Sequence, residues 1–363
     1  MNRNISSAQC CCLCFVALLS PLLRLLPGAV TDWAGAAGWV SCLLSLLPVS
    51  ALFAIYRGLC RSFPQSCGFD HILTGIFGEI GGKSLLFLWS LWLVFHSGFL
   101  LRSGADRFIA TIYPSARPPF FIWVTAGVCA VAARGHLKPL ARSAKVFLPL
   151  LAGVLGIVII FSLEDVEPAF LLPVKPNQLG DILSAVPIAA EASGAAIVNL
   201  AFLRRYTDTA SPDRSFLPWL TAAALLNTVL CVVAVGCLGK TYTAALSYPF
   251  FVLARDLTVF SGVERIEALV VGLWLLPDFV LITLELILAS DNLLLLLQPK
   301  EERTQNRVIF LLAVFAAVTA MVLAPNSQTM QHWSDEIIPT AHLFWSFGML
   351  PLLWLIHKLR RRF

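Results

Sequence analysis

The sequence predicts an all-α polytopic membrane protein whose ten transmembrane helices form two halves of opposite orientation. Three observations predict this class. Hydrophobic residues make up 58% of the 363 residues and charged residues only 13%, with a mean hydropathy of +0.81, whereas soluble domains carry about 25% charged residues. Apolar runs long enough to cross a bilayer recur along the chain. An acidic segment, 164–181, separates five of these runs from five others.

The expected spans follow from apolar runs set against charged and proline-rich breaks. They lie at roughly 10–27, 36–56, 84–112, 119–134, 145–163, 182–203, 218–239, 264–292, 307–325 and 338–357. Most of the 26 Lys and Arg residues fall in segments on the same side as the N-terminus, for example Arg134, Lys138, Arg142 and Lys145. Cytoplasmic loops carry an excess of Lys and Arg, so both termini are predicted to be cytoplasmic. The net charge of +5 therefore indicates topology and not nucleic-acid binding.

Five spans in each half force the two halves to insert with opposite orientation, which is the arrangement of an inverted repeat. We therefore expect residues 1–181 and 182–363 to be two five-helix repeats within one integral membrane domain. The segment between the fifth and sixth spans holds Glu164, Asp165, Glu167 and Asp181 against the single Lys175, which suits an outer loop.

The sixth span, within 181–203, is unusual because Pro187, Glu191, Ala192, Ser193 and Gly194 lie at its centre. A carboxylate at that depth costs roughly 2.5 to 3.5 kcal/mol on insertion scales, so it must face protein or a wet cavity. One interpretation is a broken helix that lines a ligand site near the midplane. The other is a packed helix whose small residues seat a neighbour and whose protonated Glu191 is hydrogen-bonded.

The first span has a similar central breaker, Ser20-Pro21, because proline removes one backbone hydrogen bond and clashes with the preceding turn. The first and sixth helices are therefore the two helices expected to be discontinuous.

Further polar residues lie in the third and eighth spans. Asp278 and Glu285 are seven residues apart, about two helical turns, so they share one face that should point inward. They are expected either to move protons or to meet an amine-bearing ligand, or else to be neutral carboxyls bonded to a neighbouring helix. His96 and Ser97 fall near mid-depth in the third span, where a single His is a ligand contact or a satisfied structural group.

Other chemistry has little support in the sequence. Cys10, Cys11, Cys12 and Cys14 lie in the first apolar run, where cysteine behaves as a small hydrophobe. The segment Gly78 to Ser84 resembles a phosphate loop but has Phe77 where that motif needs glycine, so we expect a loop that enters the third span. No catalytic motif or metal-ligand spacing occurs. We expect no catalytic residues, no cofactor and no metal.

Several segments resemble the spore germination permease family, the B subunits of nutrient germinant receptors, within the amino acid/polyamine/organocation transporter superfamily. The most specific is Tyr248 to Trp274, YPFFVLARDLTVFSGVERIEALVVGLW, followed by Ala133 to Leu150, ARGHLKPLARSAKVFLPL. Phe170 to Val174, FLLPV, and Asp32-Trp33 also resemble family patterns. The resemblance covers nearly the whole chain.

The resemblance implies a LeuT-like fold of two inverted five-helix repeats, with ligand held between broken first and sixth helices and flanked by the third and eighth. It implies a germinant-sensing subunit in the spore inner membrane that works with an A subunit and a lipoprotein C subunit. This chain departs from the family in its first span, where SPLLRLLPG replaces a glycine-containing break and includes Arg24. That departure predicts either an altered ligand or a receptor that has lost sensing.

We therefore expect a membrane sensor that binds a small nutrient, such as an amino acid, in a midplane cavity. Backbone N–H groups around Ser193 and Gly194 would bind a carboxylate, and Asp278 or Glu191 an amine. Glu191, Asp278 and Glu285 are the expected proton or charge carriers. A proton-coupled amino acid permease is the alternative, and a membrane enzyme lacks support because no nucleophile and base pair is evident.

Overall fold

The computed structural model describes residues 5–24, 26–63, 68–111, 113, 115–172, 174–207, 215–246, 248–256, 266–298, 303–324 and 326–360. These residues form helices, with 3-10 turns η1 to η4 and π-helical segments η5 and η6. In this part of the chain the only strand-like pairing is an isolated bridge between Ile5 and Thr207. In chain order the elements are α1 (Ser7–Arg24), α2 (Leu26–Ala34), η1 (Gly35–Ala37), α3 (Gly38–Leu44), α4 (Leu46–Arg61), α5 (Phe69–Thr111), α6 (Pro118–Arg134), α7 (Leu137–Ser162), η2 (Leu163–Asp165), α8 (Pro168–Leu171), η3 (Pro176–Gln178), α9 (Leu179–Leu203), η4 (Arg204–Tyr206), α11 (Leu217–Leu238), α12 (Lys240–Ala245), α13 (Pro249–Asp256), α14 (Ile266–Leu297), α15 (Arg303–Val322), α16 (Ser327–His332), η5 (Trp333–Ile337), α17 (Ile338–Leu343), η6 (Phe344–Met349) and α18 (Leu350–Arg360).

The all-helical membrane class is confirmed. Among the described residues, nine helical segments are long and apolar enough to cross a membrane, and the shorter apolar helix α6 accounts for a tenth. Each expected span coincides with one of them. A 17-residue helix such as α6 is about 25 Å long, close to the thickness of a hydrocarbon core.

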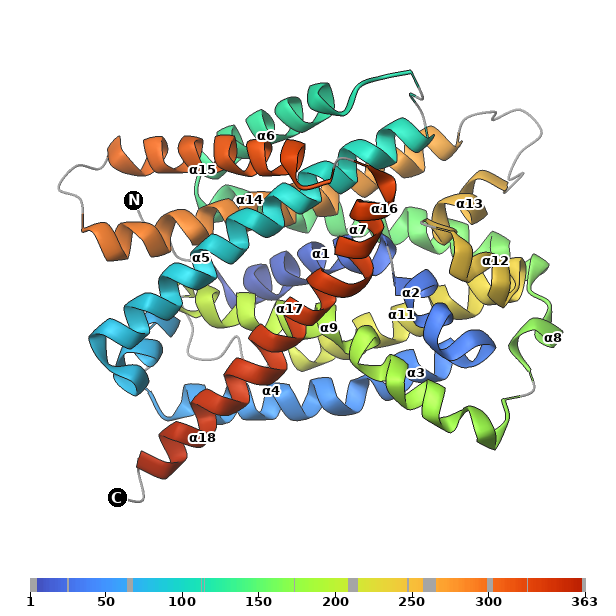
Figure 1. The fold of residues 1–363 in the computed structure, drawn as a ribbon, viewed down its shortest axis with the longest axis horizontal. Coiled ribbons are helices and arrows are strands. Elements are labelled where there is room, and N and C mark those ends of the chain that lie inside the picture. Colours follow the sequence, from blue (N-terminus) through green and yellow to red (C-terminus); the bar gives the residue numbers. More distant parts are fainter. Residues whose placement is uncertain are drawn as a thin grey trace.

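Four helices form the centre of the bundle. The buried share of the most apolar window is 83% for α1, 78% for the segment that contains α9, 72% for α14 and 61% for α5. It falls to 22% for the segment of α7 and 33% for that of α15, so these helices lie at the periphery. Figure 1 shows α1 in the middle of the bundle, α5 and α14 on one side of it, and α9 on the other.

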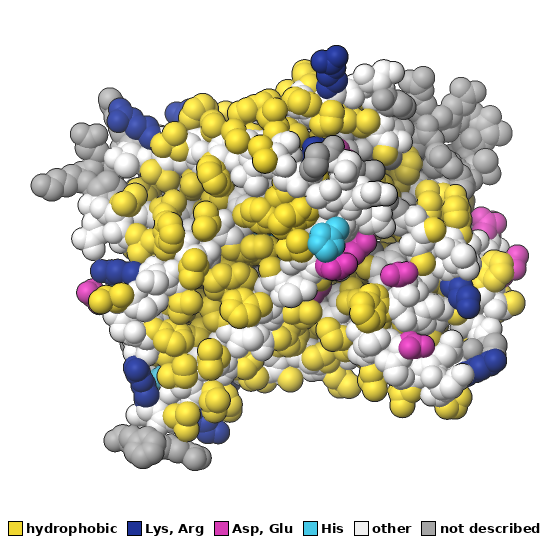
Figure 2. Space-filling view, in the orientation of Figure 1, with side chains coloured by type: hydrophobic (Ala, Val, Ile, Leu, Met, Phe, Trp, Pro, Cys, Tyr) yellow, Lys and Arg dark blue, Asp and Glu magenta, His cyan; other side chains and the backbone are white. Residues whose placement is uncertain are grey.

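The outer surface is apolar, as lipid contact requires. Large side chains such as Phe120, Val131, Phe310 and Phe315 are more than half exposed on α6 and α15. Figure 2 shows hydrophobic side chains spread across the middle of one face, with most charged side chains near its ends. A soluble monomer rarely exposes an apolar surface of that extent.

The entry to α5 differs from the expected loop. Gly78 has φ of +77°, which marks a sharp kink, and residues on both sides of it are helical. Glycine is needed there because other residues rarely adopt a positive φ. The two arms lie so close that a Cβ on Gly82 would be 2.5 Å from Thr74 Cα. Residues 79–84 are therefore the first turns of the long helix, and the predicted loop is wrong.

The sixth crossing is unbroken, which corrects the expectation of a discontinuous helix. Helix α9 runs through Pro187, Glu191, Ser193 and Gly194 without a gap. Proline removes only one backbone bond, and the flanking alanines favour helix strongly enough to carry the chain past it. The backbone N–H groups around Ser193 and Gly194 lie inside the helix, where they are bonded and unavailable to a ligand.

The first crossing is also helical at its expected breaker. Helix α1 continues through Ser20 and Pro21 and ends at Arg24, so a break at Ser20-Pro21 is not present. Helix α2 begins at Leu26, and residue 25 lies outside the described residues.

Candidate functional site

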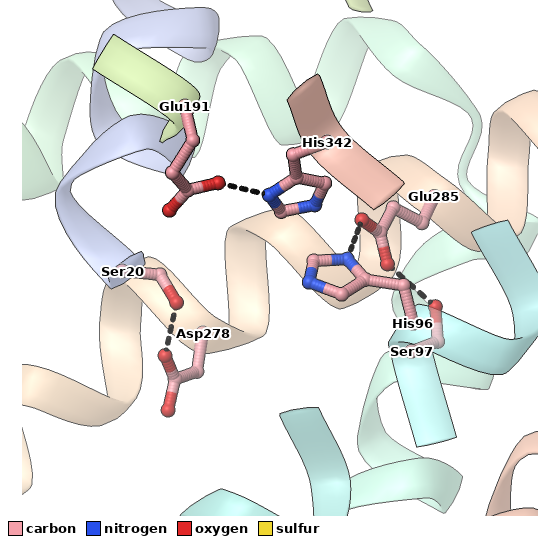
Figure 3. Close-up of polar contacts among 7 residues, drawn as sticks. All are labelled: Ser20, His96, Ser97, Glu191, Asp278, Glu285 and His342. Atoms are coloured by element: carbon pink, nitrogen blue, oxygen red, sulfur yellow. Dashed lines mark hydrogen bonds and ion pairs between the residues drawn. The ribbon is translucent and has the colours of Figure 1, made fainter. Parts of the chain in front are cut away.

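Buried polar side chains from five elements meet where α1, α5, α9, α14 and α17 pack together. We call Ser20, His96, Ser97, Glu191, Asp278, Glu285 and His342 the central polar cluster. Figure 3 shows these side chains in three bonded groups: Ser20 with Asp278, Glu191 with His342, and Glu285 with His96 and Ser97. All seven are buried. Ionisable groups at this depth are expensive unless paired, so their pairing defines what the site can do.

Both oxygens of the Asp278 carboxyl group have partners. Ser20 Oγ donates to Oδ1 at 2.5 Å, and Arg107 Nη2 donates to Oδ2 at 2.9 Å. Asp278 and Arg107 are 2% and 4% exposed, so the ion pair is shielded from water on both sides. Each oxygen of Asp278 thus has one partner in this conformation, and the two contacts tie α1, α5 and α14 together.

Glu285 lies two turns further along α14 on the same inward face, as the seven-residue spacing predicts. Its Oε2 accepts a hydrogen bond from Ser97 Oγ at 2.9 Å, and its Oε1 lies 2.6 Å from His96 Nδ1. One carboxyl thus connects to two neighbouring residues of α5.

Glu191 forms a second carboxyl–imidazole pair, with Nδ1 of His342 on α17. The rings of His342 and His96 meet edge to face, with centroids 4.8 Å apart and an interplanar angle of 76°. Trp92 stacks on His96 at a centroid distance of 5.8 Å. The two acid–imidazole pairs are therefore in contact through their rings, which brings four groups that can gain or lose a proton together between α9 and α14.

The small residues of α9 allow the last crossing, which contains α17 and η6, to pack closely against it. A Cβ on Gly194 would lie 2.5 Å from Ser346 Oγ and 2.9 Å from Ser346 Cβ, so only glycine permits this approach. Ser193 is buried, and Ala192 faces a small cavity described below. Of the two interpretations of this span, the structure favours the packed helix with a hydrogen-bonded Glu191.

Two cavities flank the cluster. The larger, about 480 Å³, we call the vestibule; its lining includes Gly28, Asp32, Ser103, Ile188 and Asp335. The smaller, about 30 Å³, we call the inner chamber; its lining includes Pro21, His96, Ala192, Glu285 and His342. The inner chamber has room for one or two water molecules, and the vestibule falls within the size range of small-ligand sites.

The opposite end of the bundle is closed by a second polar group, which we call the Asp291 cluster. Asp291 accepts hydrogen bonds from Tyr206 and from Gln305 Nε2, the latter at 2.7 Å, and lies 3.9 Å from Arg205 Nη2. Ile5 N donates to Tyr206 O at 2.7 Å, which ties the start of the described chain to η4. Among the described residues, these contacts hold η4, α14 and α15 together beyond the inner chamber, on the side away from the vestibule.

Replacing Asp291 with alanine is expected to loosen this closed end, because it leaves Tyr206 and Gln305 without their common acceptor. Hydrogen bonds to charged groups contribute about 1.5 to 3 kcal/mol, so the Ile5 amide should exchange hydrogen at least about 10-fold faster. Hydrogen–deuterium exchange in detergent measures this rate. Glu79→Gln, which removes an exposed pair with Lys83, is the control. Equal exchange in both variants would contradict a closing role.

Two residues that contribute to this site, His342 and Arg107, were not predicted from the sequence. His342 lies in the apolar run IPTAHLFWSFGML, and Arg107 lies near the end of the third span. Both are ionisable residues inside an expected membrane span, and that feature alone could have identified them as candidate site residues. The flanking π-helical segments η5 and η6, which resemble the irregular turns common at functional sites, had no such sequence pattern.

Metal binding has no support in the described part of the chain, where no group of three or more His, Cys, Asp or Glu side chains is arranged to hold an ion.

The bundle and its buried polar centre define the class of this protein as an all-helical, multi-pass membrane protein. Residues 4–329 match the model of the Spore_permease family, described as spore germination protein. The chain therefore belongs to the spore germination permease family. The most specific family-like segment, Tyr248 to Trp274, lies partly outside the described residues, at 257–265.

Individual relatives agree with this family. The chain is 24% identical over 187 residues to spore germination protein KB of Bacillus subtilis (strain 168), a match that spans 51% of this chain and 49% of that protein. The crystal structure of MhsT in complex with L-phenylalanine matches with a TM-score of 0.68 and 16% identity, over 98% of this chain and 89% of that one. At that identity the likeness shows a shared LeuT-type fold.

Proposed function

We propose that this chain is the nutrient-sensing membrane subunit of a spore germinant receptor. A small amino-acid-like nutrient enters the vestibule, binds above the central polar cluster and shifts the balance between conformations of the bundle. The observation that carries this proposal is the buried polar cluster that lies between the vestibule and the Asp291 cluster. A ligand changes such an equilibrium only by binding one state more tightly than the other.

The assembly belongs to the same proposal. The family supports partnership with an A subunit and a lipoprotein C subunit in the spore inner membrane, with both termini cytoplasmic. Residues 1–181 and 182–363 would act as two inverted repeats that move relative to each other. The lipid bilayer covers the exposed apolar faces of α6, α7 and α15.

A proton-coupled amino acid permease is the second candidate, and one observation favours it. The Glu191–His342 and Glu285–His96 pairs meet at the inner chamber, where a water molecule that bridges them would complete a route for a proton across the middle of the bundle. In a sensor the same contact would be only a polar connection between α9 and α14.

Reconstitution separates the two candidates. Purified protein in proteoliposomes is supplied with each radiolabelled proteinogenic amino acid, with and without an imposed pH gradient. We expect saturable binding of at least one amino acid without accumulation. Accumulation that follows the proton gradient and disappears in Glu285→Gln would replace the sensor with the permease, and absence of any binding would contradict both.

A further inference from the structure

A buried arginine at the end of α1 is not used by the site as described above. Arg24 is 2% exposed, and its guanidinium carbon lies 4.8 Å from the centroid of the Phe99 ring. Its Nε and Nη1 atoms have no hydrogen-bond partner, and it forms no ion pair, with any residue that the structure describes. Asp278 and Glu191 are near enough to attract the guanidinium, but neither is bonded to it. A buried cation without a bonded counter-ion is unfavourable, so this position suits an anion.

The protein's own carboxylates nearby are already engaged. Asp278 is bonded to Ser20 and Arg107, Glu285 to Ser97 and His96, and Glu191 to His342. Arg107 thus has a carboxylate partner supplied by the chain, whereas Arg24, four residues after Ser20 on α1, does not.

The register of α5 places Arg24 between the two cavities. Phe99, on which the guanidinium lies, comes three residues after His96 of the inner chamber and four before Ser103 of the vestibule. At 1.5 Å per residue these positions are within about 6 Å along the helix. The first crossing gives the same order, because Pro21 lines the inner chamber and Gly28 lines the vestibule.

The vestibule above Arg24 carries the opposite charge. Asp32, Asp106 and Asp335 line it, and its single arginine, Arg102, is already paired with Asp106 at 3.0 Å. A simple anion would be repelled by this acidic wall, whereas a zwitterion can direct its ammonium group to the wall and its carboxylate to the floor. Such a charge pattern orients an amino acid with its carboxylate toward Arg24 and its ammonium group toward the acidic wall.

We propose that Arg24 binds the α-carboxylate of the amino acid ligand. Guanidinium and carboxylate form two parallel, charge-assisted hydrogen bonds through the Nε–Nη2 edge or the Nη1–Nη2 edge, and each of these edges of Arg24 carries one nitrogen that lacks a partner. In this chain the Arg24 side chain thus provides the hydrogen-bond donors for a carboxylate that backbone N–H groups would provide at a helix break. The inference rests on the proposed function, because it names the group that anchors the ligand.

The test compares amino acids with their carboxamides on the wild-type protein. Thermal unfolding in lipid nanodiscs is followed with each of the proteinogenic amino acids, and any that stabilises the protein is compared with its amide and with the matching simple acid, for example L-alanine, L-alaninamide and propionate. We expect the amide to bind about 10- to 100-fold more weakly, because a charge-assisted bond is lost. Propionate should also bind more weakly than L-alanine.

Substitution provides a second, independent result. Arg24→Gln should melt at a higher temperature than wild type without ligand, because it removes an unpaired buried charge, and should lose stabilisation by the amino acid. Arg24→Lys should keep part of that stabilisation, and Arg142→Gln, at an exposed site on α7, should leave it unchanged. A purely structural arginine would instead lower the melting temperature when replaced.

The outcomes separate the two proposals. Equal binding of an amino acid and its amide would overturn the role of Arg24 while leaving nutrient binding in place, and this comparison needs no variant to fold. Tighter binding of propionate than of L-alanine would overturn the proposal that the ligand is a zwitterion. No response to any amino acid or simple carboxylate would overturn both the role of Arg24 and the proposal that the protein senses a nutrient.

Discussion

Replacing Asp278 with alanine is expected to destabilise the protein by about 3 to 5 kcal/mol, the largest stability effect of a single substitution in the central polar cluster. The substitution leaves the Arg107 guanidinium buried without its carboxylate, and it removes the acceptor of Ser20. In a buried ion pair, loss of one partner is costly because the remaining charge has been taken out of water. The midpoint of thermal unfolding in detergent measures the effect.

A compensating variant distinguishes the ion pair from the shape of the side chain. Asp278→Ala combined with Arg107→Met should recover most of the lost stability, because both charges are then absent. Asp181→Ala, at an exposed position in the first turn of α9, is the matched control and should change little. If the Asp278→Ala variant has the same unfolding midpoint as the Asp181→Ala control, the buried pair does not hold α1, α5 and α14 together.

Replacing Gly194 with alanine is expected to force α9 and the last crossing apart. The new Cβ would lie 2.5 Å from Ser346 Oγ, and Phe347 Cε2 would be 3.0 Å away, so a packed segment must move. Overpacking of this kind costs about 1 to 3 kcal/mol, and leucine should cost more. Glu191 and His342 lie one turn from Gly194 and Ser346, so the displacement should also break their hydrogen bond and abolish ligand response.

Thermal unfolding and ligand-induced stabilisation measure these two effects. Gly153→Ala is the control, since a Cβ there meets nothing within 4 Å and the change improves helix propensity on α7. Ser346→Ala, added to Gly194→Ala, should recover part of the stability by removing the Oγ atom. Normal stability and normal response in Gly194→Ala would rule out a close contact at this point.

The sequence was sufficient for the class of the protein and for most of its crossings. Apolar runs such as 36–56 and 182–203 are long because the bilayer core is thick, so length and composition locate them without reference to any neighbour. The inward direction of Asp278 and Glu285 was predictable in the same way, because helical periodicity alone puts them on one face. The family-like segments were equally evident in the sequence.

The continuity of α9 could not be obtained from the sequence. Proline, serine and glycine at the centre of a span are compatible with a break and with close packing, and the choice depends on what lies opposite. Ser346 lies against Gly194, and this contact, between residues far apart in the chain, explains the small side chain without any gap in the helix.

Length, polarity and helical period therefore came from the sequence, since each depends on neighbouring residues and on the surrounding lipid. The pairing of the polar side chains was decided by the tertiary structure. Arg107 and Asp278 are 171 residues apart in the sequence, and Glu191 and His342 are 151 apart. Such pairs form only when distant helices are brought together. The same packing left Arg24 without a bonded carboxylate among the described residues, a property that no local pattern in the chain contains.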